Sequence, residues 1–237
     1  MEKDKDIFQF KQFEVSHRNS SMRVGTDAVV LGAWADISNQ KKILEVGTGC
    51  GIISLMIAQR NADAIIDAID IDEGSVEEAR LNFNRSPWSK RLSVCKNSFQ
   101  SFEPNQKYDH IISNPPFFES GTKSPVNKRQ NARHTNMLTF EELIKNTKKL
   151  LAENGKLSLI IPFEEQERMY DVIERQQLNI HKKLNFKAKE TTKIERVLLT
   201  IGSNTTEKEE LSMYQYNADG TWSSDYKNLT KDFYLKL

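Results

Sequence analysis

Between residues 41 and 176 the sequence alternates between short apolar runs and longer stretches with helical character. The apolar runs have the length of strands and occupy residues 42–46, 64–70, 91–96, 108–113 and 156–162. Stretches that fit helices follow most of them, at residues 51–60, 75–84, 139–152 and 163–176. Repeated strand–helix units predict a parallel sheet with right-handed crossovers and with helices on both faces.

The alternation stops after residue 176. Residues 178–188 and 193–202 are two long strand patterns joined by a charged turn, with no helix between them. Such a pair predicts an antiparallel hairpin at the C-terminal edge of the sheet. The expected fold is therefore an α/β protein of the Rossmann-like kind, with a mostly parallel sheet and an antiparallel C-terminal edge hairpin.

The flanks of the alternating region carry shorter elements. Residues 7–17 predict one or two short strands, and residues 28–35 a buried helix that Thr26 or Asp27 caps. An apolar-aromatic element around residues 211–214 and a helix at 225–235 are expected to fold back on the sheet. We therefore divide the chain into N-terminal strands and helix packing over the site (1–40), a central domain (41–202) and a C-terminal extension (203–237).

Helix boundaries inside the central region follow from capping residues. Ser75 is expected to begin one helix, and Thr139 to cap another that Gly155 closes. The carboxylate of Asp72 offers an alternative cap for the helix that contains Ser75. These assignments fix where each helix begins relative to the strand before it.

Composition excludes several classes of protein. Hydrophobic residues make up 38% and charged residues 28% of the 237 residues, as in soluble globular proteins. No apolar run has the length of a membrane span, and the charged stretch at residues 1–6 does not fit a signal peptide, so we expect no membrane partner. Cys50 and Cys95, both expected in core elements, fit a reducing cytoplasm.

Metal and nucleic-acid binding can be judged from the same counts. The four histidines lie without ligand spacing, so no metal site is expected. Because the net charge is only +1, a nucleic-acid partner would have to meet a local basic patch. Five lysines of the C-terminal hairpin could contact phosphates, or could simply be the charged surface of an edge strand: Lys182, Lys183, Lys187, Lys189 and Lys193.

A glycine-rich loop, Glu45 to Gly51, joins the first strand of the alternating region to the helix after it. Its three glycines, Gly47, Gly49 and Gly51, permit a sharp turn and the close approach of a ligand to the backbone. No lysine follows as in a phosphate-binding P-loop, which disfavours a nucleoside triphosphate. The loop is typical of a nucleotide-like ligand that is not a triphosphate.

Polar residues end the next strands along the chain. Asp70 ends the second strand between two isoleucines that we expect in the core, and its carboxylate can accept hydrogen bonds from ribose hydroxyls. Asn97 follows the third strand, where an amide can meet an adenine amino group. The carboxyl ends of parallel strands share one edge of the sheet, where open α/β folds bind ligands.

The fourth strand ends in Asn114-Pro115-Pro116-Phe117-Phe118. The two prolines fix φ and remove two backbone donors, which predicts a stiff extended ledge. The ledge presents one amide, free carbonyls and two aromatic rings. These groups suit the binding of a flat ring that carries an amino group, although a strand-ending turn with buried aromatics would use the same residues.

These motifs, in this order and spacing, resemble the class I S-adenosylmethionine-dependent methyltransferases that methylate amino groups. Longer stretches resemble one bacterial family within that class, the tRNA1(Val) adenine N6-methyltransferases. They are Phe10-Lys11-Gln12-Phe13, residues 22–27, residues 31–35, Ser86-Pro87-Trp88, residues 129–135, residues 196–199 and residues 233–235. Two positions depart from the family pattern: phenylalanines replace tyrosines at 117 and 118, and Asn97 stands where methyltransferases often have aspartate.

The resemblance implies a function and a set of site residues. The family methylates the adenine 3′ of the anticodon in a valine tRNA, with S-adenosylmethionine as cofactor, in the cytoplasm; we expect a monomer. The implied catalytic residues are Asn114, Pro115, Pro116 and Phe117. The implied cofactor-binding residues are Thr26, Asp27, Glu45, Gly47, Thr48, Gly49, Gly51, Asp70, Asn97 and Asn114. The implied RNA-binding residues are Phe117, Phe118, Lys128, Arg129, Arg133 and His134.

Other functions fit the Asn-Pro-Pro-Phe motif equally well. Guanine N2-methylation of ribosomal RNA and glutamine N5-methylation of a protein both need a planar amino group held in the same way. A different class of function would be an RNA-binding module on a methyltransferase fold that has lost its activity. The intact glycine loop, Asp70 and Asn114 argue against the last of these.

Overall fold

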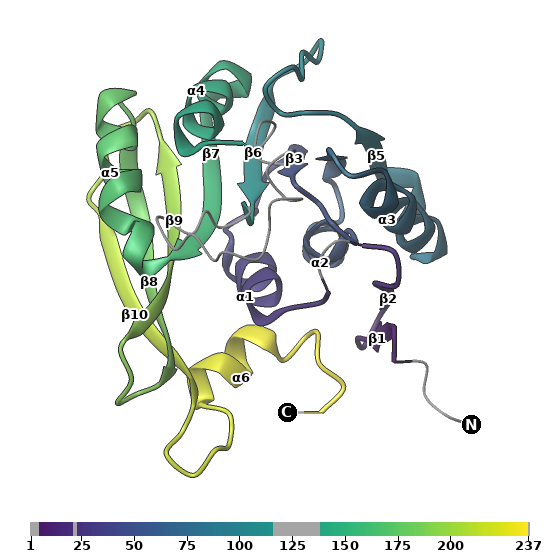
Figure 1. The fold of residues 1–237 in the computed structure, drawn as a ribbon, viewed down its shortest axis with the longest axis vertical. Coiled ribbons are helices and arrows are strands. Elements are labelled where there is room, and N and C mark those ends of the chain that lie inside the picture. Colours follow the sequence, from purple (N-terminus) through teal and green to yellow (C-terminus); the bar gives the residue numbers. More distant parts are fainter. Residues whose placement is uncertain (1–4, 21–22, 116–137, 237) are drawn as a thin grey trace, which may run out of the picture.

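The computed structural model describes residues 5–20, 23–115 and 138–236, and an eight-stranded sheet lies at its centre (Figure 1). The strands of this sheet are β3 (Lys42–Val46), β4 (Ile65–Asp70), β5 (Leu92–Lys96), β6 (Tyr108–Ser113), β7 (Leu151–Pro162), β8 (Asn179–Lys189), β9 (Ile194–Gly202) and β10 (Glu209–Tyr216). Their order is β10-β8-β9-β7-β6-β3-β4-β5. Strands β7, β6, β3, β4 and β5 run parallel, whereas β9 is antiparallel to both β7 and β8. The predicted mostly parallel sheet with a C-terminal antiparallel hairpin is confirmed.

The C-terminal extension adds a strand beyond the hairpin. Residues 209–216 form β10, which pairs in parallel with β8 over Lys182–Lys189. The outer edge of the sheet is therefore β10, and β8 has hydrogen-bonded neighbours on both sides. The sequence predicted an apolar element here without its pairing, because eight residues with mixed polar and aromatic side chains do not specify a partner strand.

Helices cover both faces of the sheet, as predicted. One face packs against α1 (Thr26–Trp34), α2 (Ile52–Arg60), α3 (Glu73–Arg85) and α6 (Ser224–Thr230), and the other against α4 (Phe140–Leu150) and α5 (Gln166–Arg175). Adjacent strand residues alternate between the two cores: Ile112 belongs to the first and Ile111 to the second. Both cores are continuous, so every central strand is buried on two sides, as parallel sheets usually are.

The N-terminal strands β1 (Ile7–Gln9) and β2 (Glu14–Ser16) form a small hairpin beside the C-terminal segment. Phe10 forms an isolated bridge with Tyr234, and the N–H of Lys11 donates to the carbonyl of Phe233 at 2.8 Å. The Phe10 ring stacks on Phe13 at 4.6 Å and lies 6.0 Å from Tyr234. The two segments, more than 200 residues apart, are thus held together by backbone bonds and a shared aromatic cluster.

Three of the preferred helix boundaries are wrong, although the alternative cap of α3 at Asp72 is confirmed. Gly25, not Thr26 or Asp27, is the N-cap of α1, and no side chain caps that helix. Asp72 is the N-cap of α3, where its carboxylate accepts from the N–H of Ser75 at 2.8 Å, so Ser75 lies inside the helix. Helix α4 ends at Leu150, and Gly155 lies within β7. At the end of α4 the reason is visible, because β7 begins directly after it at Leu151.

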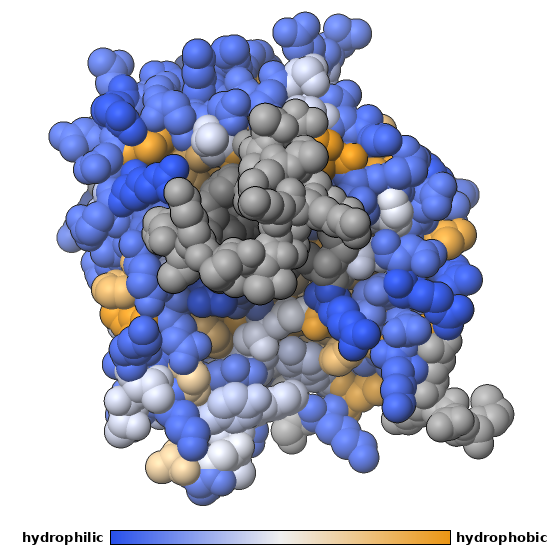
Figure 2. Space-filling model, viewed as in Figure 1, coloured by the Kyte–Doolittle hydropathy of each residue, from blue (hydrophilic) through white to orange (hydrophobic). Residues whose placement is uncertain are grey.

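The remaining elements are short. The described residues include two 3-10 helices, η1 (Ser89–Arg91) and η3 (Phe163–Glu165), which directly precede β5 and α5. The helix predicted at 163–176 therefore starts as a tighter turn. Hydrophilic side chains cover most of the face in Figure 2, and apolar ones form small separate patches. None of the helices in the described ranges combines the length and apolar character needed to cross a bilayer. Cys50 is buried but Cys95 is exposed, which corrects its expected place in the core.

Candidate active site

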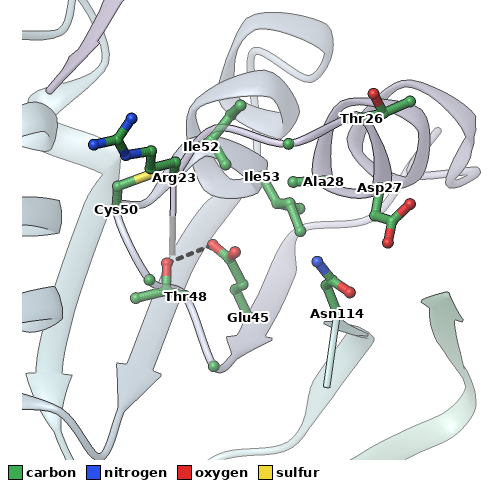
Figure 3. Close-up of a pocket in the computed structure, with 13 residues that line it drawn as sticks. Arg23, Thr26, Asp27, Ala28, Glu45, Thr48, Cys50, Ile52, Ile53 and Asn114 are labelled. Carbon is green, nitrogen blue, oxygen red and sulfur yellow. Dashed lines mark hydrogen bonds between the residues drawn. The ribbon is translucent and has the colours of Figure 1, made fainter. Parts of the chain in front are cut away.

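A pocket of about 210 Å³ opens at the carboxyl edge of the parallel strands, between the start of α1, the loop after β3 and the tip of β6 (Figure 3). Its lining includes residues that the sequence predicted from three separate motifs: Thr26, Asp27, Glu45, Gly47, Thr48, Gly49 and Asn114. The lining also includes residues that the motifs did not identify, namely Arg23, Gly25, Ala28, Cys50, Ile52 and Ile53. The sheet therefore brings the glycine loop and the Asn-Pro-Pro motif to one cavity, as expected from the strand order.

Glu45 lies at the floor of the pocket with 1% of its surface exposed. Its Oε2 accepts hydrogen bonds from the Thr48 hydroxyl at 2.7 Å and from both the N–H and the hydroxyl of Ser54. Its Oε1 is buried without a hydrogen-bond partner among the described residues. Burial raises the pKa of Glu45 to about 7. One oxygen is thus held in place while the other is available to a donor that enters the pocket.

The glycine loop has left-handed backbone at Gly47, Gly49 and Gly51, with φ of 74°, 54° and 84°. A Cβ at Gly47 would meet no atom within 4 Å, so this position faces open space in the pocket. Gly51 is different, because a Cβ there would lie 2.5 Å from the Phe83 ring. Gly51 is the N-cap of α2 and is absent from the pocket lining, so its observed role is the close packing of α2 against α3.

Asp70, at the end of β4, contacts the glycine loop from the side. Its Oδ2 accepts from the N–H of Gly49 at 2.8 Å, and its Oδ1 from the N–H of Asp72 at 2.9 Å. Burial raises the pKa of Asp70 above its ordinary value. The N–H of Asn97 donates to the carbonyl of Asp70 at 3.0 Å, which places the tips of β4 and β5 side by side. Neither side chain lines the pocket itself, and both lie farther along the same edge of the sheet.

Ile71 corrects one sequence expectation at this edge. It follows Asp70 and was expected in the core, yet 49% of its surface is exposed. The strand ends at Asp70, so the alternation of buried and exposed side chains no longer applies at residue 71. An exposed apolar residue therefore directly follows Asp70 in the chain.

Asn114 projects into the pocket from the end of β6. Its Oδ1 is buried and has no hydrogen-bond partner among the described residues. The preceding hydroxyl, on Ser113, donates to the carbonyl of Val46 at 2.9 Å and ties the tip of β6 to that of β3. A buried amide oxygen without a hydrogen-bond partner is rare in folded proteins, and a donor bound in this pocket would supply that partner.

Cys50 and Asp27 complete the wall of the pocket. Burial raises the pKa of Cys50 to about 12, so its thiol stays protonated and is not a nucleophile. The Asp27 carboxylate accepts from Nε of Arg196 on β9 at 2.8 Å. Thr26 and Asp27 thus face the cavity from the first turn of α1 instead of capping that helix. The described residues contain no group of His, Cys, Asp or Glu placed to hold a metal ion.

The chain leaves the pocket at Pro115 and re-enters the described range at Leu138. Several predicted site residues lie outside the described residues: Pro116, Phe117, Phe118, Lys128, Arg129, Arg133 and His134.

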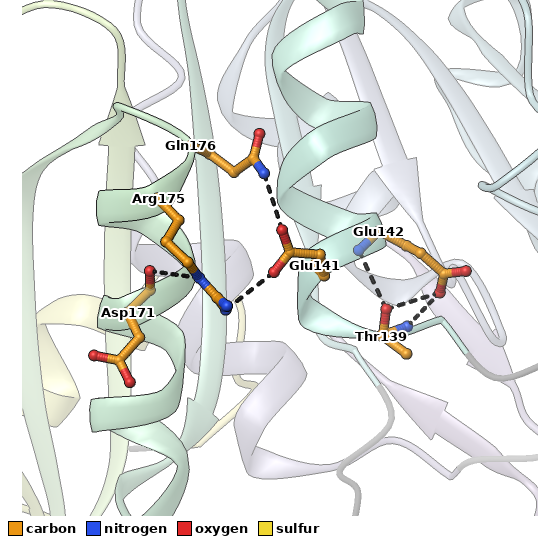
Figure 4. Close-up of polar contacts among 6 residues, drawn as sticks. All are labelled: Thr139, Glu141, Glu142, Asp171, Arg175 and Gln176. Atoms are coloured by element: carbon orange, nitrogen blue, oxygen red, sulfur yellow. Dashed lines mark hydrogen bonds and ion pairs between the residues drawn. The ribbon is translucent and has the colours of Figure 1, made fainter.

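Helix α4 begins with a complete capping box (Figure 4). The Thr139 hydroxyl accepts from the N–H of Glu142, and the Glu142 carboxylate accepts from the N–H of Thr139. Glu141 accepts from Arg175 at 3.1 Å and from Gln176 at 3.0 Å, which fixes the start of α4 against α5.

The lysines of the C-terminal hairpin are mostly paired. Lys182 contacts Glu209 at 3.2 Å, Lys183 contacts Glu210 at 3.0 Å, and Lys193 contacts Glu164 at 3.3 Å. The first two pairs join β8 to β10 across the parallel register. These contacts favour a role in which the lysines hold the outer strands together. They do not favour a free cationic surface that contacts phosphates.

Comparison with known proteins identifies the family. Residues 21–189 match the methyltransferase small domain. A tRNA1(Val) (adenine(37)-N6)-methyltransferase from Parabacteroides distasonis is 38% identical over 233 residues, which cover 97% of this chain and 98% of that protein. A protein of the same name from Flavobacterium psychrophilum is 40% identical over 234 residues, 98% of this chain and 100% of its own length.

Solved structures agree on the fold. A predicted O-methyltransferase from Agrobacterium tumefaciens superposes with a TM-score of 0.68 at 15% identity, over 87% of this chain and 96% of that one. The glycopeptide N-methyltransferase MtfA, in complex with S-adenosyl-L-methionine, gives a TM-score of 0.55 at 10% identity, over 76% of this chain and 89% of that one. The match to the family model and the identity over nearly the whole length establish that this chain belongs to the methyltransferase small domain family and, within it, to the tRNA1(Val) (adenine(37)-N6)-methyltransferase family.

Proposed function

We propose that this protein transfers a methyl group from S-adenosylmethionine to N6 of the adenine 3′ of the anticodon in a valine tRNA. The observation that carries the proposal is the buried, unpartnered Oδ1 of Asn114 in the same pocket as the glycine loop and Glu45. Membership of a family whose curated relatives bear this name supports the choice of substrate. The proposed place of action is the cytoplasm, where tRNA is found.

The residues present fit the cofactor. The unpartnered Oε1 of Glu45 suits the ammonium of an amino acid, because a buried carboxylate is stabilised by a positive partner. The open space at Gly47 permits close approach of a ligand to the loop. We assign the ribose hydroxyls to Asp70, the adenine edge to Asn97 and the adenine face to Ile71. Thr26, Asp27, Thr48 and Gly49 would complete the wall around the methionine end.

The protein's part in the reaction is to present the substrate amine correctly. The lone pair of an adenine amino group is delocalised into the ring and is a poor nucleophile. Hydrogen bonds from the amino group to Oδ1 of Asn114 and to the carbonyl of Pro115 would hold it so that the lone pair points away from the ring plane. This is catalysis by orientation and preorganised electrostatics, without a covalent enzyme intermediate.

Bound S-adenosylmethionine would supply an electrophilic methyl group on a positively charged sulfur. Held by Glu45 and Asp70, it would give this methyl group to the amine that Asn114 orients, and the electron pair of the carbon–sulfur bond would stay with the donor. The resulting ammonium is acidic and loses its proton to water, so a strong general base is unnecessary. Glu45 and Asp70 hold the ligand in this scheme and take no proton from the substrate.

The remaining site residues are assigned to the RNA. Phe117 and Phe118 would stack on a flipped base, and Lys128, Arg129, Arg133 and His134 would contact the phosphates around it. Single-stranded loops are where proteins read RNA sequence, and an anticodon loop is of that kind. We further propose that residues 41–202 form the catalytic domain, with residues 1–40 and 203–237 as extensions that hold its edges.

Methyl transfer to tRNA tests the proposed function directly. Purified protein is incubated with labelled S-adenosylmethionine and total tRNA from cells that lack the activity, and the modified nucleoside and tRNA are identified. N6-methyladenosine in a valine tRNA supports the proposal. N2-methylguanosine, or methylation of a protein glutamine, would reassign the substrate, and the absence of cofactor binding would leave only an RNA-binding role.

A further inference from the structure

Asn82, on α3, uses both ends of its side-chain amide although only 1% of its surface is exposed. Its Nδ2 donates to the carbonyl of Cys50 at 2.8 Å and to the carbonyl of Ser16 at 2.7 Å. Its Oδ1 accepts from the N–H of Ser16 at 2.9 Å. One buried side chain therefore joins three segments of the chain, namely helix α3, the glycine loop and the end of β2.

Glu78 makes a second connection from the same helix. It lies four residues before Asn82, on the same face of α3, and its buried carboxylate accepts from the N–H of Asn19 at 2.8 Å. The chain that follows β2 also lies close to the glycine loop, because a Cβ at Gly49 would meet Oγ of Ser20 at 3.5 Å. In Figure 1, β2 lies beside α3. The segment after β2 is thus attached to α3 and lies against the glycine loop.

The glycine loop depends on residues outside it for its shape. Its glycines have left-handed backbone, and glycine loses more conformational freedom on ordering than any other residue. Asp70 fixes a donor of the loop, the N–H of Gly49, and Asn82 fixes an acceptor, the carbonyl of Cys50. Cys50 lines the pocket (Figure 3). A ligand that binds a loop already held in shape does not have to supply the free energy of ordering it.

We propose that Asn82 is a positioning residue that holds the glycine loop in its ligand-binding shape, and that Glu78 supports it by keeping the segment after β2 against that loop. Neither residue lines the pocket, so each acts through the backbone groups that it bonds. The inference rests on the proposed function, because it takes S-adenosylmethionine as the ligand of the loop. It gives α3 and the N-terminal strands a task in cofactor binding.

Asn61 provides a matched control for Asn82. Its Nδ2 also donates to two backbone carbonyls, those of Ile37 and Gln40, both at 2.8 Å. Its Oδ1 accepts from two backbone N–H groups. The residue lies outside the pocket lining, at the end of α2 that is distant from the glycine loop. The same substitution at the two asparagines therefore breaks the same kind of hydrogen bonds with and without a connection to the loop.

The test compares Asn82→Asp with Asn61→Asp. Aspartate keeps the size and an accepting oxygen, but it places a second oxygen against the two carbonyls that the amide nitrogen bonded. Thermal unfolding measures stability, and calorimetry below the unfolding transition measures the dissociation constant of S-adenosylmethionine. Both variants should unfold at a lower temperature than the wild type. Only Asn82→Asp should bind the cofactor more weakly, by about 10-fold, the factor that corresponds to the loss of one or two hydrogen bonds.

The added carboxylate cannot itself cause this result, because a negative charge attracts a cofactor whose net charge is positive. At saturating cofactor, kcat of Asn82→Asp for tRNA should stay close to the wild-type value, whereas KM for S-adenosylmethionine should rise. If Asn82→Asp does not fold, Glu78→Ala and Glu78→Gln provide the same test. Glutamine keeps an accepting oxygen for the N–H of Asn19 and should retain the affinity, whereas alanine should weaken it.

Four results would overturn the inference. Wild-type cofactor affinity in Asn82→Asp, with the wild type active on tRNA, refutes the positioning role and leaves the proposed function standing. An equal loss of affinity in Asn61→Asp would assign the effect to general destabilisation. A lower kcat at saturating cofactor, with unchanged affinity, would assign Asn82 to the transfer step. A wild type that does not bind S-adenosylmethionine refutes the proposed function and this inference together.

Discussion

The N–H of Gly49 donates a hydrogen bond of 2.8 Å to Oδ2 of Asp70, which joins the glycine loop to the tip of the neighbouring strand. The second carboxylate oxygen accepts from the N–H of Asp72 at 2.9 Å. Two backbone donors therefore fix the orientation of the carboxylate before any ligand arrives. Each oxygen retains a further lone pair, so the group can still accept hydrogen bonds from ribose hydroxyls.

Replacing Asp70 with alanine should weaken the binding of S-adenosylmethionine by about 10- to 100-fold, the usual effect of losing hydrogen bonds to a charged group. Asp70→Asn should have an intermediate affinity, since one accepting oxygen remains. Calorimetry measures both, and circular dichroism checks that the fold is retained. An affinity equal to that of the wild type would assign the ribose to another residue.

Replacing Asn114 with alanine should abolish methyl transfer while the affinity for the cofactor stays within a fewfold of the wild type. The side chain is assigned to the substrate amine, and its loss removes an interaction made at the reacting centre. Single-turnover transfer to tRNA and calorimetric titration measure the two effects separately. Near-normal turnover by Asn114→Ala would refute the proposed mechanism.

Binding of the cofactor should release protons from Glu45 near pH 6.5. The carboxyl has a pKa of about 7 because it is buried, so part of the free protein is protonated at that pH. An ammonium placed beside the unpartnered Oε1 favours the ionised form and lowers the pKa, and the proton then leaves. Calorimetry in buffers of different ionisation enthalpy detects this release, which Glu45→Gln should remove. Identical binding heats in all buffers would place the ammonium elsewhere.

His110 should make the protein less stable as the pH falls. It is buried, its Nε2 lies 2.9 Å from the Ser158 hydroxyl, and burial lowers its pKa to about 4. Because the folded pKa lies below the unfolded value of about 6.5, the stability is fully present above pH 6.5 and is lost as the pH falls toward 4. The loss should be on the order of 1–3 kcal/mol, and urea unfolding of the wild type and His110→Gln over this pH range measures it.

Glu45 acts in the opposite direction, which provides the control for this experiment. Its folded pKa of about 7 exceeds the unfolded value, so its contribution is present below pH 4.5 and is lost as the pH rises through 7. In the wild type, the effects of His110 and Glu45 on the free energy of unfolding therefore partly cancel between pH 4.5 and 6.5. His110→Gln should therefore expose the loss due to Glu45, and Glu45→Gln the loss due to His110. Parallel slopes in both variants would contradict the assignment.

Two glycines of one loop should respond differently to alanine. Both Gly47 and Gly51 have positive φ, which costs any other residue about 1 kcal/mol. Only at Gly51 would the added Cβ also meet the Phe83 ring, at 2.5 Å. Gly51→Ala should therefore lower thermal stability more than Gly47→Ala, whereas Gly47→Ala should lower cofactor affinity more. Equal stability of the two variants would show that Phe83 moves aside.

The sequence was most informative where structure is local. Glu45, Asp70 and Asn114 were assigned to one edge because each follows an apolar run in a strand–helix alternation, and parallel strands bring such ends together. Ile71 was misplaced because the end of a strand is decided by pairing with its neighbour. The preferred N-caps of α1 and α3 were wrong by one to three residues, whereas the alternative cap at Asp72 is confirmed.

Long-range contacts could not be derived from the sequence. The pairing of β10 with β8 brings together residues such as Lys183 and Glu210, which no local pattern identifies as partners. Likewise, Asp27 and Arg196 each belong to a recognisable stretch, but their contact joins the first turn of α1 to β9. Periodicity and capping depend on residues that are close in sequence. These contacts form only when the completed sheet brings distant segments together.

The contact between the N-terminal hairpin and the segment around Tyr234 has a consequence for biosynthesis. The Phe10 and Phe13 rings can complete their packing only when residues 230–235 are present, after the whole central sheet has been translated. Until then the hairpin exposes aromatic surface on the nascent chain, of the kind that chaperones bind. Closing a loop of more than 200 residues is also slow, so this contact is expected to form among the last. The folding of the protein would thus end with the docking of the N-terminal hairpin on the C-terminal segment.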